Sequence, residues 1–329
     1  MHGRLYPARK RRLWLSLALV AAGLAVCAAV LGLVDRSQSA RVSRQYQAQL
    51  TAGVKTLAVD GIAVSYREMG IPLEEEQTTT DPTAPSPPLL LIHGFMGSSY
   101  DFHAVMPGLT ETRPVIAVDL PGFGLSDKSP DLDYSKQRMA DLLLRFMSIL
   151  EYDQFDIIGH SMGGEIALRM ALTEPQHMSR LVLLSSGGSA DIQRGFAGTA
   201  PEWLLDSIFK NYLVQRLYFP LAVGQIRYAS AAWFDPFFFF NREIPAATIN
   251  QMTRDNDSGQ IAGQLKEISQ PTLLVWGDKD RVIPLKQGQI MNEQIPDSRL
   301  IVYENCGHLV ALERSDELRD DLTDFFSES

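Results

Sequence analysis

The stretch FDIIGHSMGGEIAL, from Phe155 to Leu168, moves from an apolar run into a helical pattern through one sharp turn. Ser161 stands in that turn, with Gly159 and Gly163 two positions away on either side. Glycines fit there because a Cβ would collide in so tight a strand-to-helix turn. The helix N-terminus beside Ser161 carries a partial positive charge that favours an anion. This context predicts a nucleophilic serine; the alternative is a serine that only caps the helix.

The rest of the chain repeats the same alternation of short apolar runs and helical patterns. A hairpin over residues 54–70, turning near Asp60-Gly61, precedes them. The Val-, Ile- and Leu-rich runs are typical of strands buried on both faces. The order therefore predicts an α/β fold, a mostly parallel sheet with helices on both faces. The expected strands are 89–94, 115–122, 155–161, 181–186, 272–278 and 300–308, and the expected helices are 135–150, 162–173, 285–294 and 315–326.

One segment, about 188–260, lacks this alternation and is rich in aromatic residues. Thirteen of them lie between Phe196 and Phe240. We expect an inserted helical cap here, with some of its aromatic side chains roofing an apolar pocket. The expected domains are thus an N-terminal segment, residues 1–44, and a body, residues 45–329, that carries the cap.

The charge distribution is uneven along the chain. The net charge is -9, but residues 1–44 hold eight Lys or Arg and a single acid, so the body is strongly acidic. An acidic body would repel phosphates, which argues against nucleic acid as a partner. The two cysteines, Cys27 and Cys306, are too far apart in the chain to suggest a disulfide framework.

The N-terminal segment contains 22 residues without a charge, Leu13–Val34. As a helix this run would reach about 33 Å, enough to cross a bilayer core of about 30 Å. Basic residues before it predict a single-pass anchor with a cytoplasmic N-terminus and a catalytic domain on the non-cytoplasmic side, periplasmic if the source is bacterial. The alternative is a signal peptide that is cleaved, which would leave a secreted protein.

A serine hydroxyl needs a base, and histidine is the usual one. In proteins with a Gly-x-Ser-x-Gly elbow, an acid and then a histidine follow the serine in the chain. Only His177 and His308 follow Ser161. His177 lies where the elbow helix ends and is expected at the surface. His308 closes the last apolar run, at the sheet edge where ligand chemistry collects, so it is the expected base.

Two aspartates, Asp278 and Asp280, follow the strand before His308, in WGDKDRVIP. Either could orient the histidine, although Asp278 beside Gly277 also suits a turn.

An attack by Ser161 would further create an oxyanion. The backbone N–H groups of Phe95, after LLLIHG, and Met162, after the serine, are the expected donors. Cys306 has no base spaced to serve it and is expected to be a buried apolar thiol.

With these residues in place, the chain resembles the α/β-hydrolase superfamily, and within it capped serine esterases, monoacylglycerol-lipase-like hydrolases and C–C bond hydrolases. The resemblance covers roughly Val54 to Phe326. In this family the second aspartate of the WGxxDxxxP pattern is usually the acid, which implies Asp280. The family implies no metal and no organic cofactor. Dehalogenases and epoxide hydrolases of the fold carry Asp at the elbow, whereas this chain has Ser161. The matching motifs, in the family's order, are HGFMGSS, DLPGFGLSD, GHSMGG, VWGDKDRVIP and NCGHLVALERSD.

The expected function is a serine hydrolase that cleaves apolar or lipid-derived carboxylic esters through an acyl-enzyme on Ser161. A C–C bond hydrolase or a cofactor-free perhydrolase of the same fold is the alternative. A C–C hydrolase would need basic groups to bind an acidic dienoate, and the cap has few. A non-catalytic receptor on the same fold is the alternative from another class, but such proteins usually lose a member of the catalytic set. Labelling by a fluorophosphonate would separate a serine hydrolase from a receptor.

Overall fold

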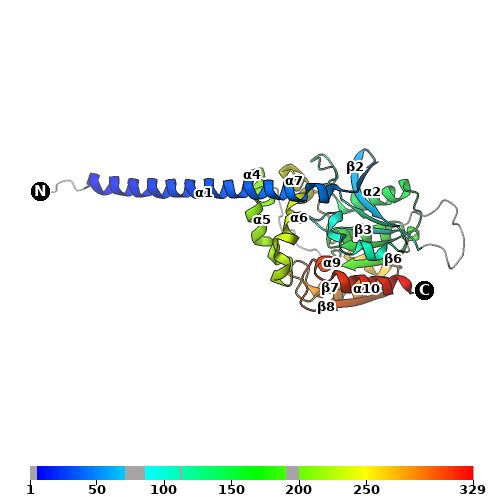
Figure 1. The fold of residues 1–329 in the computed structure, drawn as a ribbon. Coiled ribbons are helices and arrows are strands. Elements are labelled where there is room, and N and C mark those ends of the chain that lie inside the picture. Colours follow the sequence, from blue (N-terminus) through cyan, green and yellow to red (C-terminus); the bar gives the residue numbers. More distant parts are fainter. Residues whose placement is uncertain (1–5, 71–85, 112, 190–199, 329) are drawn as a thin grey trace. The chain divides into compact units, whose positions relative to one another are not determined.

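The computed structural model describes residues 6–70, 86–111, 113–189 and 200–328, with side chains from residue 29 onward. It divides into two compact units, Met1–Gln47 and Ala48–Ser329. The first unit holds most of helix α1 (Tyr6–Thr51). The second unit holds the sheet and the remaining helices (Figure 1).

An eight-stranded sheet runs through the second unit in the order β1-β2-β4-β3-β5-β6-β7-β8. β1 pairs with β2, and β2 with β4, in antiparallel fashion, while every later pairing is parallel. This confirms the predicted α/β fold with its mostly parallel sheet. The strands are β1 (Val54–Val59), β2 (Ile62–Met69), β3 (Leu89–Ile92), β4 (Val115–Val118), β5 (Phe155–His160), β6 (Met178–Leu184), β7 (Thr272–Gly277) and β8 (Ser298–Tyr303).

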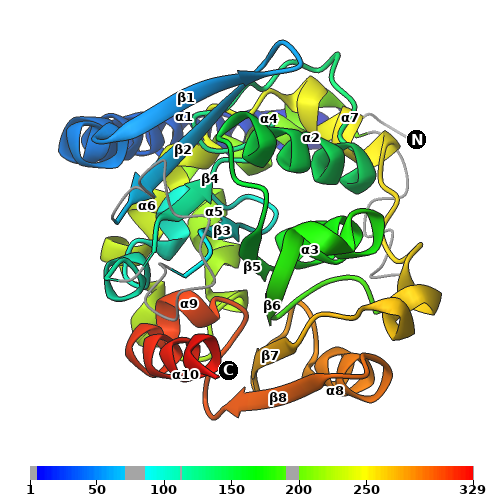
Figure 2. The ribbon, with the colours of Figure 1, turned by 90° about the vertical axis from the view of Figure 1, so that its right-hand side faces the viewer.

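Helices cover both faces of this sheet (Figure 2). One face is packed by α2 (Lys136–Ile149), α3 (Met162–Thr173) and α8 (Leu285–Gln294). The opposite face is packed by α9 (Val310–Glu313) and α10 (Ser315–Ser327). Helices on both faces leave the central strands no solvated side, which explains their continuous apolar sequence.

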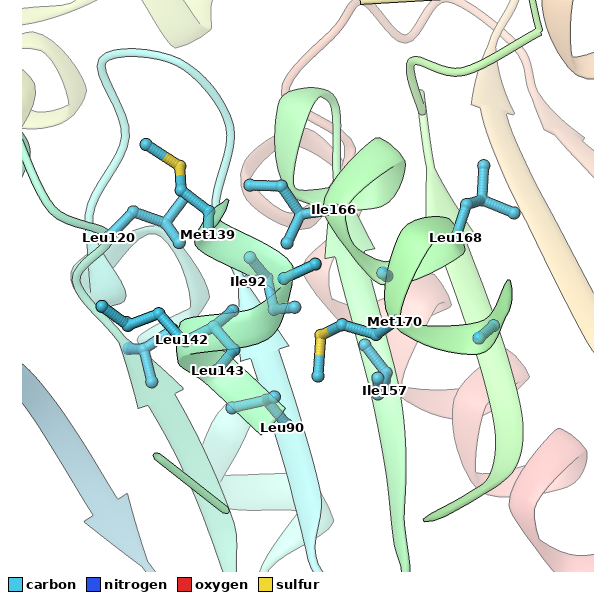
Figure 3. Packing of buried hydrophobic residues seen from close by; sticks show 14 of the residues in the cluster. Leu90, Ile92, Leu120, Met139, Leu142, Leu143, Ile157, Ile166, Leu168 and Met170 are labelled. Atoms are coloured by element: carbon cyan, nitrogen blue, oxygen red, sulfur yellow. The ribbon is translucent and has the colours of Figure 1, made fainter. Parts of the chain in front are cut away.

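Alternation along each strand divides the core into two hydrophobic layers. In β3, Leu90 and Ile92 join the layer beneath α2 and α3, whereas Leu89 and Leu91 join the layer beneath α10. Figure 3 shows the first layer, with strand side chains meeting Leu142, Leu143 and Met170 from the two helices. The sheet is therefore held from both sides, and its carboxyl edge is a rigid platform for side chains.

In the described part of the segment between β6 and β7, where the strand–helix alternation is lost, there are four α-helices. They are α4 (Glu202–Phe209), α5 (Tyr212–Tyr218), α6 (Ala231–Asn241) and α7 (Ala246–Arg254). Residues 190–199 lie outside the described residues, so the expected start of a cap near 188 and the boundary at 44/45 stay predictions. In α6 the run Phe238–Phe240 is buried, and Phe237 is half-buried.

The predicted membrane anchor over Leu13–Val34 is wrong. Among the described residues, no helix is both long enough and apolar enough to cross a bilayer. Helix α1 continues unbroken from Tyr6 to Thr51, so charged residues such as Asp35 and Arg36 belong to the same helix as the apolar run. The side chains of residues 6–28 lie outside the described part. Two further predictions depended on this anchor: the membrane as a partner, and a catalytic domain on its non-cytoplasmic side. Both are corrected together with the anchor.

Candidate active site

The turn between β5 and α3 holds Ser161 in a backbone conformation that few residues adopt. Its φ is 55° and its ψ is -117°, and its N–H donates to the Leu184 carbonyl at 2.9 Å. A Cβ on Gly159 would lie 2.6 Å from the Gly163 carbonyl oxygen, and one on Gly163 would overlap the Ile92 carbonyl. Both glycines are therefore required by close backbone approach, as the sequence predicts, and the serine is held at the carboxyl edge of the sheet.

The structure brings His308 and Asp280 to this serine from the loops after β8 and β7. His308 Nδ1 lies 2.8 Å from Asp280 Oδ2, and His308 Nε2 lies 2.9 Å from Ser161 Oγ. All three residues are buried. Because the carboxylate accepts, Nδ1 carries the imidazole hydrogen, and Nε2 is free to accept the proton of the serine hydroxyl. The three side chains thus form a continuous hydrogen-bonded chain.

Asp280 is oriented by its own backbone. Its Oδ1 accepts from the N–H groups of Val282 and Ile283, both at 2.8 Å, which leaves Oδ2 for the histidine. Burial acts to raise the pKa of Asp280, but the hydrogen bonds from His308 and the two amides outweigh it and lower the pKa below 3.8. Asp280 therefore stays ionised beside the imidazole.

Asp278, the other aspartate in the same loop, points elsewhere. Its Oδ1 accepts weakly from the Cys306 N–H at 3.4 Å, and its Oδ2 pairs with Lys279 at 3.1 Å. Among the described contacts, His308 bonds Asp280 and not Asp278, so the geometry separates two aspartates that the residue pattern alone left equivalent. Cys306 is fully buried and burial raises the pKa of its thiol, in line with an inert core residue.

Three further histidines lie outside this hydrogen-bonded chain and bond to backbone groups. His93 donates from Nδ1 to the Gly94 carbonyl and accepts at Nε2 from the Leu120 N–H. His160 donates from Nε2 to the His308 carbonyl at 2.9 Å, and burial together with His308 lowers the pKa of His160 to about 3. His177 bonds the Asp153 carbonyl on a 3-10 turn and does not line the site. Sequence reasoning missed His160, whose role depends on a contact 148 positions away.

The expected oxyanion donors flank the serine. Met162 follows Ser161 and opens α3. Gly94 precedes Phe95 and lies so close to the elbow that a Cβ on it would meet Ser161 Cβ at 2.8 Å and Oγ at 3.3 Å. The Phe95 ring packs edge-on against Phe123, with 5.4 Å between ring centroids. A reacting carbonyl at Ser161 would therefore lie beside both backbone segments.

A cavity of about 410 Å³ opens over Ser161 and His308. Aromatic residues of the segment between β6 and β7 line it, among them Phe219, Trp233 and Phe240. The described lining residues include one carboxylate, Asp101, and no Lys or Arg. Across the described ranges, no three His, Cys, Asp or Glu side chains gather in a way that could hold a metal ion. The remaining lining residues are Gly94, Phe95, Met96, Gly97, Ser98, Tyr100, Phe102, His103, His160, Tyr218, Leu221, Ala222, Ala232, Pro236, Phe237, Val282, Leu309, Ala311 and Leu312.

Comparison with known proteins places this architecture among hydrolases. A family described as alpha/beta hydrolase fold matches residues 87–217 and 226–315. The chain is 30% identical to the uncharacterized hydrolase YugF of Bacillus subtilis, over 83% of this chain and 97% of that protein. It is 30% identical to a 2-hydroxymuconate semialdehyde hydrolase of Pseudomonas sp. over 74% and 87% of the two chains. It is 31% identical to Lipase 1 of Psychrobacter immobilis, over 73% of this chain and 77% of that protein.

Proposed function

The chain belongs to the α/β-hydrolase fold family and is a hydrolase, and from this premise we propose that it cleaves carboxylic esters through an acyl-enzyme on Ser161. The observation that carries the proposal is the hydrogen-bonded chain from Ser161 through His308 to Asp280, at 2.9 Å and 2.8 Å. A serine so connected is the activated nucleophile that acyl transfer requires.

Each residue has a role in the proposed reaction. His308 Nε2 removes the proton from Ser161 Oγ as the oxygen attacks the ester carbonyl, and the protonated imidazole then gives that proton to the leaving alcohol. Water repeats the sequence on the acyl-enzyme and releases the acid. Asp280 holds the imidazole in the required tautomer and stabilises its charged form. The backbone N–H groups of Phe95 and Met162 stabilise the oxyanion, each worth about 3 kcal/mol in such sites.

The cavity supports an apolar, uncharged substrate. Its walls are aromatic and aliphatic, and no cationic side chain stands among the described lining residues to hold an acidic substrate. Phe219, Trp233 and Phe240 come from the segment between β6 and β7, and we propose that this segment acts as a cap. Burial of an acyl chain against such walls is favourable by up to about 0.8 kcal/mol per CH₂. Medium-chain and lipid-derived esters such as monoacylglycerols are the substrates proposed.

A second candidate is hydrolysis of a C–C bond. It is favoured by the likeness to a 2-hydroxymuconate semialdehyde hydrolase, whose level of identity equals that to YugF. The same serine, histidine and aspartate could serve either reaction, and the two differ in the group that must be bound. The absence of a cation among the described lining residues favours the neutral ester.

One experiment separates these candidates. The purified protein is assayed against p-nitrophenyl octanoate, monooctanoylglycerol and 2-hydroxymuconate semialdehyde, and is treated with a fluorophosphonate. We expect ester turnover and labelling, both abolished in Ser161→Ala and both retained in Ser207→Ala, whose hydroxyl lies on the exposed face of α4. Cleavage of the semialdehyde with no ester turnover would reject the proposal in favour of the second candidate.

A further inference from the structure

The imidazole of His103 lines the cavity but has no part in the proposed reaction. His103 follows the 3-10 helix η1 (Ser99–Phe102), nine residues after the Gly94 approach to the elbow, and lines the same cavity as Ser161. It is half-buried and lies beside the rings of Tyr100 and Trp233, which also line the cavity. A polar side chain in so apolar a wall raises the question of what it binds.

The hydrogen bond of His103 determines which nitrogen is available. Nδ1 lies 2.8 Å from the Tyr100 carbonyl oxygen, which can only accept, so Nδ1 carries a hydrogen. Burial lowers the pKa of His103, and although the hydrogen bond to the Tyr100 carbonyl acts to raise it, the Arg67 charge also lowers it; the net shift is downward from 6.5, so the ring is neutral near pH 7. In a neutral ring with hydrogen on Nδ1, Nε2 has a lone pair and no hydrogen. No hydrogen bond from the described residues reaches this Nε2.

The ring is also held in place. It stacks on Tyr100 at 4.2 Å between centroids with 7° between the ring planes, and the Trp233 ring lies 6.4 Å away. Nδ1 faces the backbone of its own turn, so Nε2, at the tip of the ring, points away from that backbone. His103 Nε2 is therefore a fixed hydrogen-bond acceptor on a residue that lines a mainly apolar cavity.

We propose that His103 determines specificity, its Nε2 accepting a hydrogen bond from a hydroxyl group of the substrate. The inference rests on the proposed ester hydrolysis and narrows the substrate class to esters that carry a free hydroxyl. An unpartnered hydroxyl in an apolar cavity is unfavourable by roughly 1–3 kcal/mol, so an acceptor in this part of the wall favours hydroxylated esters over plain ones. His103 removes that penalty. The hydroxyl belongs either to the alcohol, as in a monoacylglycerol, or to the acyl chain.

Two matched ester pairs test the inference and distinguish these sources. The first pair is monooctanoylglycerol and propyl octanoate, and the second is methyl ω-hydroxyoctanoate and methyl octanoate. The measured quantity is the ratio of kcat/KM for the hydroxylated ester to kcat/KM for its plain partner. In His103→Phe, which keeps an aromatic ring on Tyr100, this ratio should fall about tenfold in one pair, as the loss of one neutral hydrogen bond implies. His103→Gln, whose amide oxygen can accept, should keep more of the ratio.

The control is His177→Phe. His177 makes the same type of bond, from Nδ1 to the Asp153 carbonyl at 2.6 Å, but does not line the cavity, so its ratios should match those of the unchanged protein. Unchanged ratios for both pairs in His103→Phe, with all four esters turned over, would overturn the role of His103 and leave ester hydrolysis standing. An equal fall in His177→Phe would also overturn it. No turnover of any ester would reject the proposed function together with this inference.

Discussion

Replacing Asp280 by asparagine should nearly abolish activity although it removes a single charge. Asn is the same size, and its amide must fit between two fixed partners. The N–H groups of Val282 and Ile283, each 2.8 Å from Oδ1, can only donate, so the amide oxygen must face them. The amide NH₂ is then left facing His308 Nδ1, 2.8 Å from the position of Oδ2.

The expected loss of kcat follows from the tautomer that His308 must adopt. An NH₂ group donates, so His308 must accept at Nδ1 and carry its hydrogen on Nε2. That nitrogen lies 2.9 Å from Ser161 Oγ and can no longer accept the serine proton. A substitution of this kind in a serine protease lowers kcat by about 10⁴, and we expect a loss on that order here.

The assay is kcat for p-nitrophenyl octanoate, together with the rate of fluorophosphonate labelling and a thermal unfolding curve. The matched control is Asp278→Asn in the same loop. Asp278 contacts the Cys306 N–H and Lys279, whereas the imidazole bonds Asp280, so the Asp278 variant should remain within about threefold, the scale of surface substitutions. Near-normal kcat in Asp280→Asn, or a large loss confined to Asp278→Asn, would refute the assignment of the acid.

Three further outcomes are expected. Gly94→Ala should lower kcat about a hundredfold, because its Cβ would lie 2.8 Å from Ser161 Cβ and displace the nucleophile; a normal kcat would contradict the packing. Across p-nitrophenyl esters, kcat/KM should rise by up to about fourfold for each added CH₂ until the cavity is full, whereas a strict preference for acetate would exclude an apolar acyl site. Burial raises the pKa of Asp101 from 3.8 to about 7, so the stability that its protonated form contributes is full below pH 3.8 and is lost as pH rises through 7. Asp101→Asn should therefore raise the melting temperature by a few degrees at pH 8 and change it little at pH 3.5; an equal shift at both pH values would mean that Asp101 does not titrate in this range.

Much of the fold could be predicted because its signals are local. The apolar runs differ by only a few residues from the observed strands, as at β5 (Phe155–His160) and β7 (Thr272–Gly277). Side-chain period and turn chemistry are properties of neighbouring residues, and they need no knowledge of distant contacts. For the same reason Ser161 and His308 could be selected as site residues, since each lies at the end of a strand and parallel strands end at one edge.

In the N-terminal segment, the prediction made from local sequence failed. A run of 22 uncharged residues is long enough to predict a membrane-spanning helix. Among the described residues, however, no helix has both the length and the apolar character needed to cross a bilayer. Length and hydropathy of one run do not determine where its helix begins and ends. In the structure the helix continues to Thr51, through residues that the pattern had assigned to its flank.

By itself the sequence determined the strand–turn–helix elbow, the parallel sheet and the residues at strand ends, since each depends on spacing within one segment. The residue pattern left both aspartates open and only the family resemblance implied Asp280; the tertiary structure shows that Asp280 faces His308, because the two aspartates lie two positions apart and differ in the direction that the loop backbone gives them. It also decided that His160 bonds the His308 carbonyl and that Tyr100, His103 and Trp233 share a cavity wall. Those contacts join segments more than a hundred residues apart. The first forms when the loop after β8 packs beside the end of β5, and the second when the segment between β6 and β7 packs over the loop after β3.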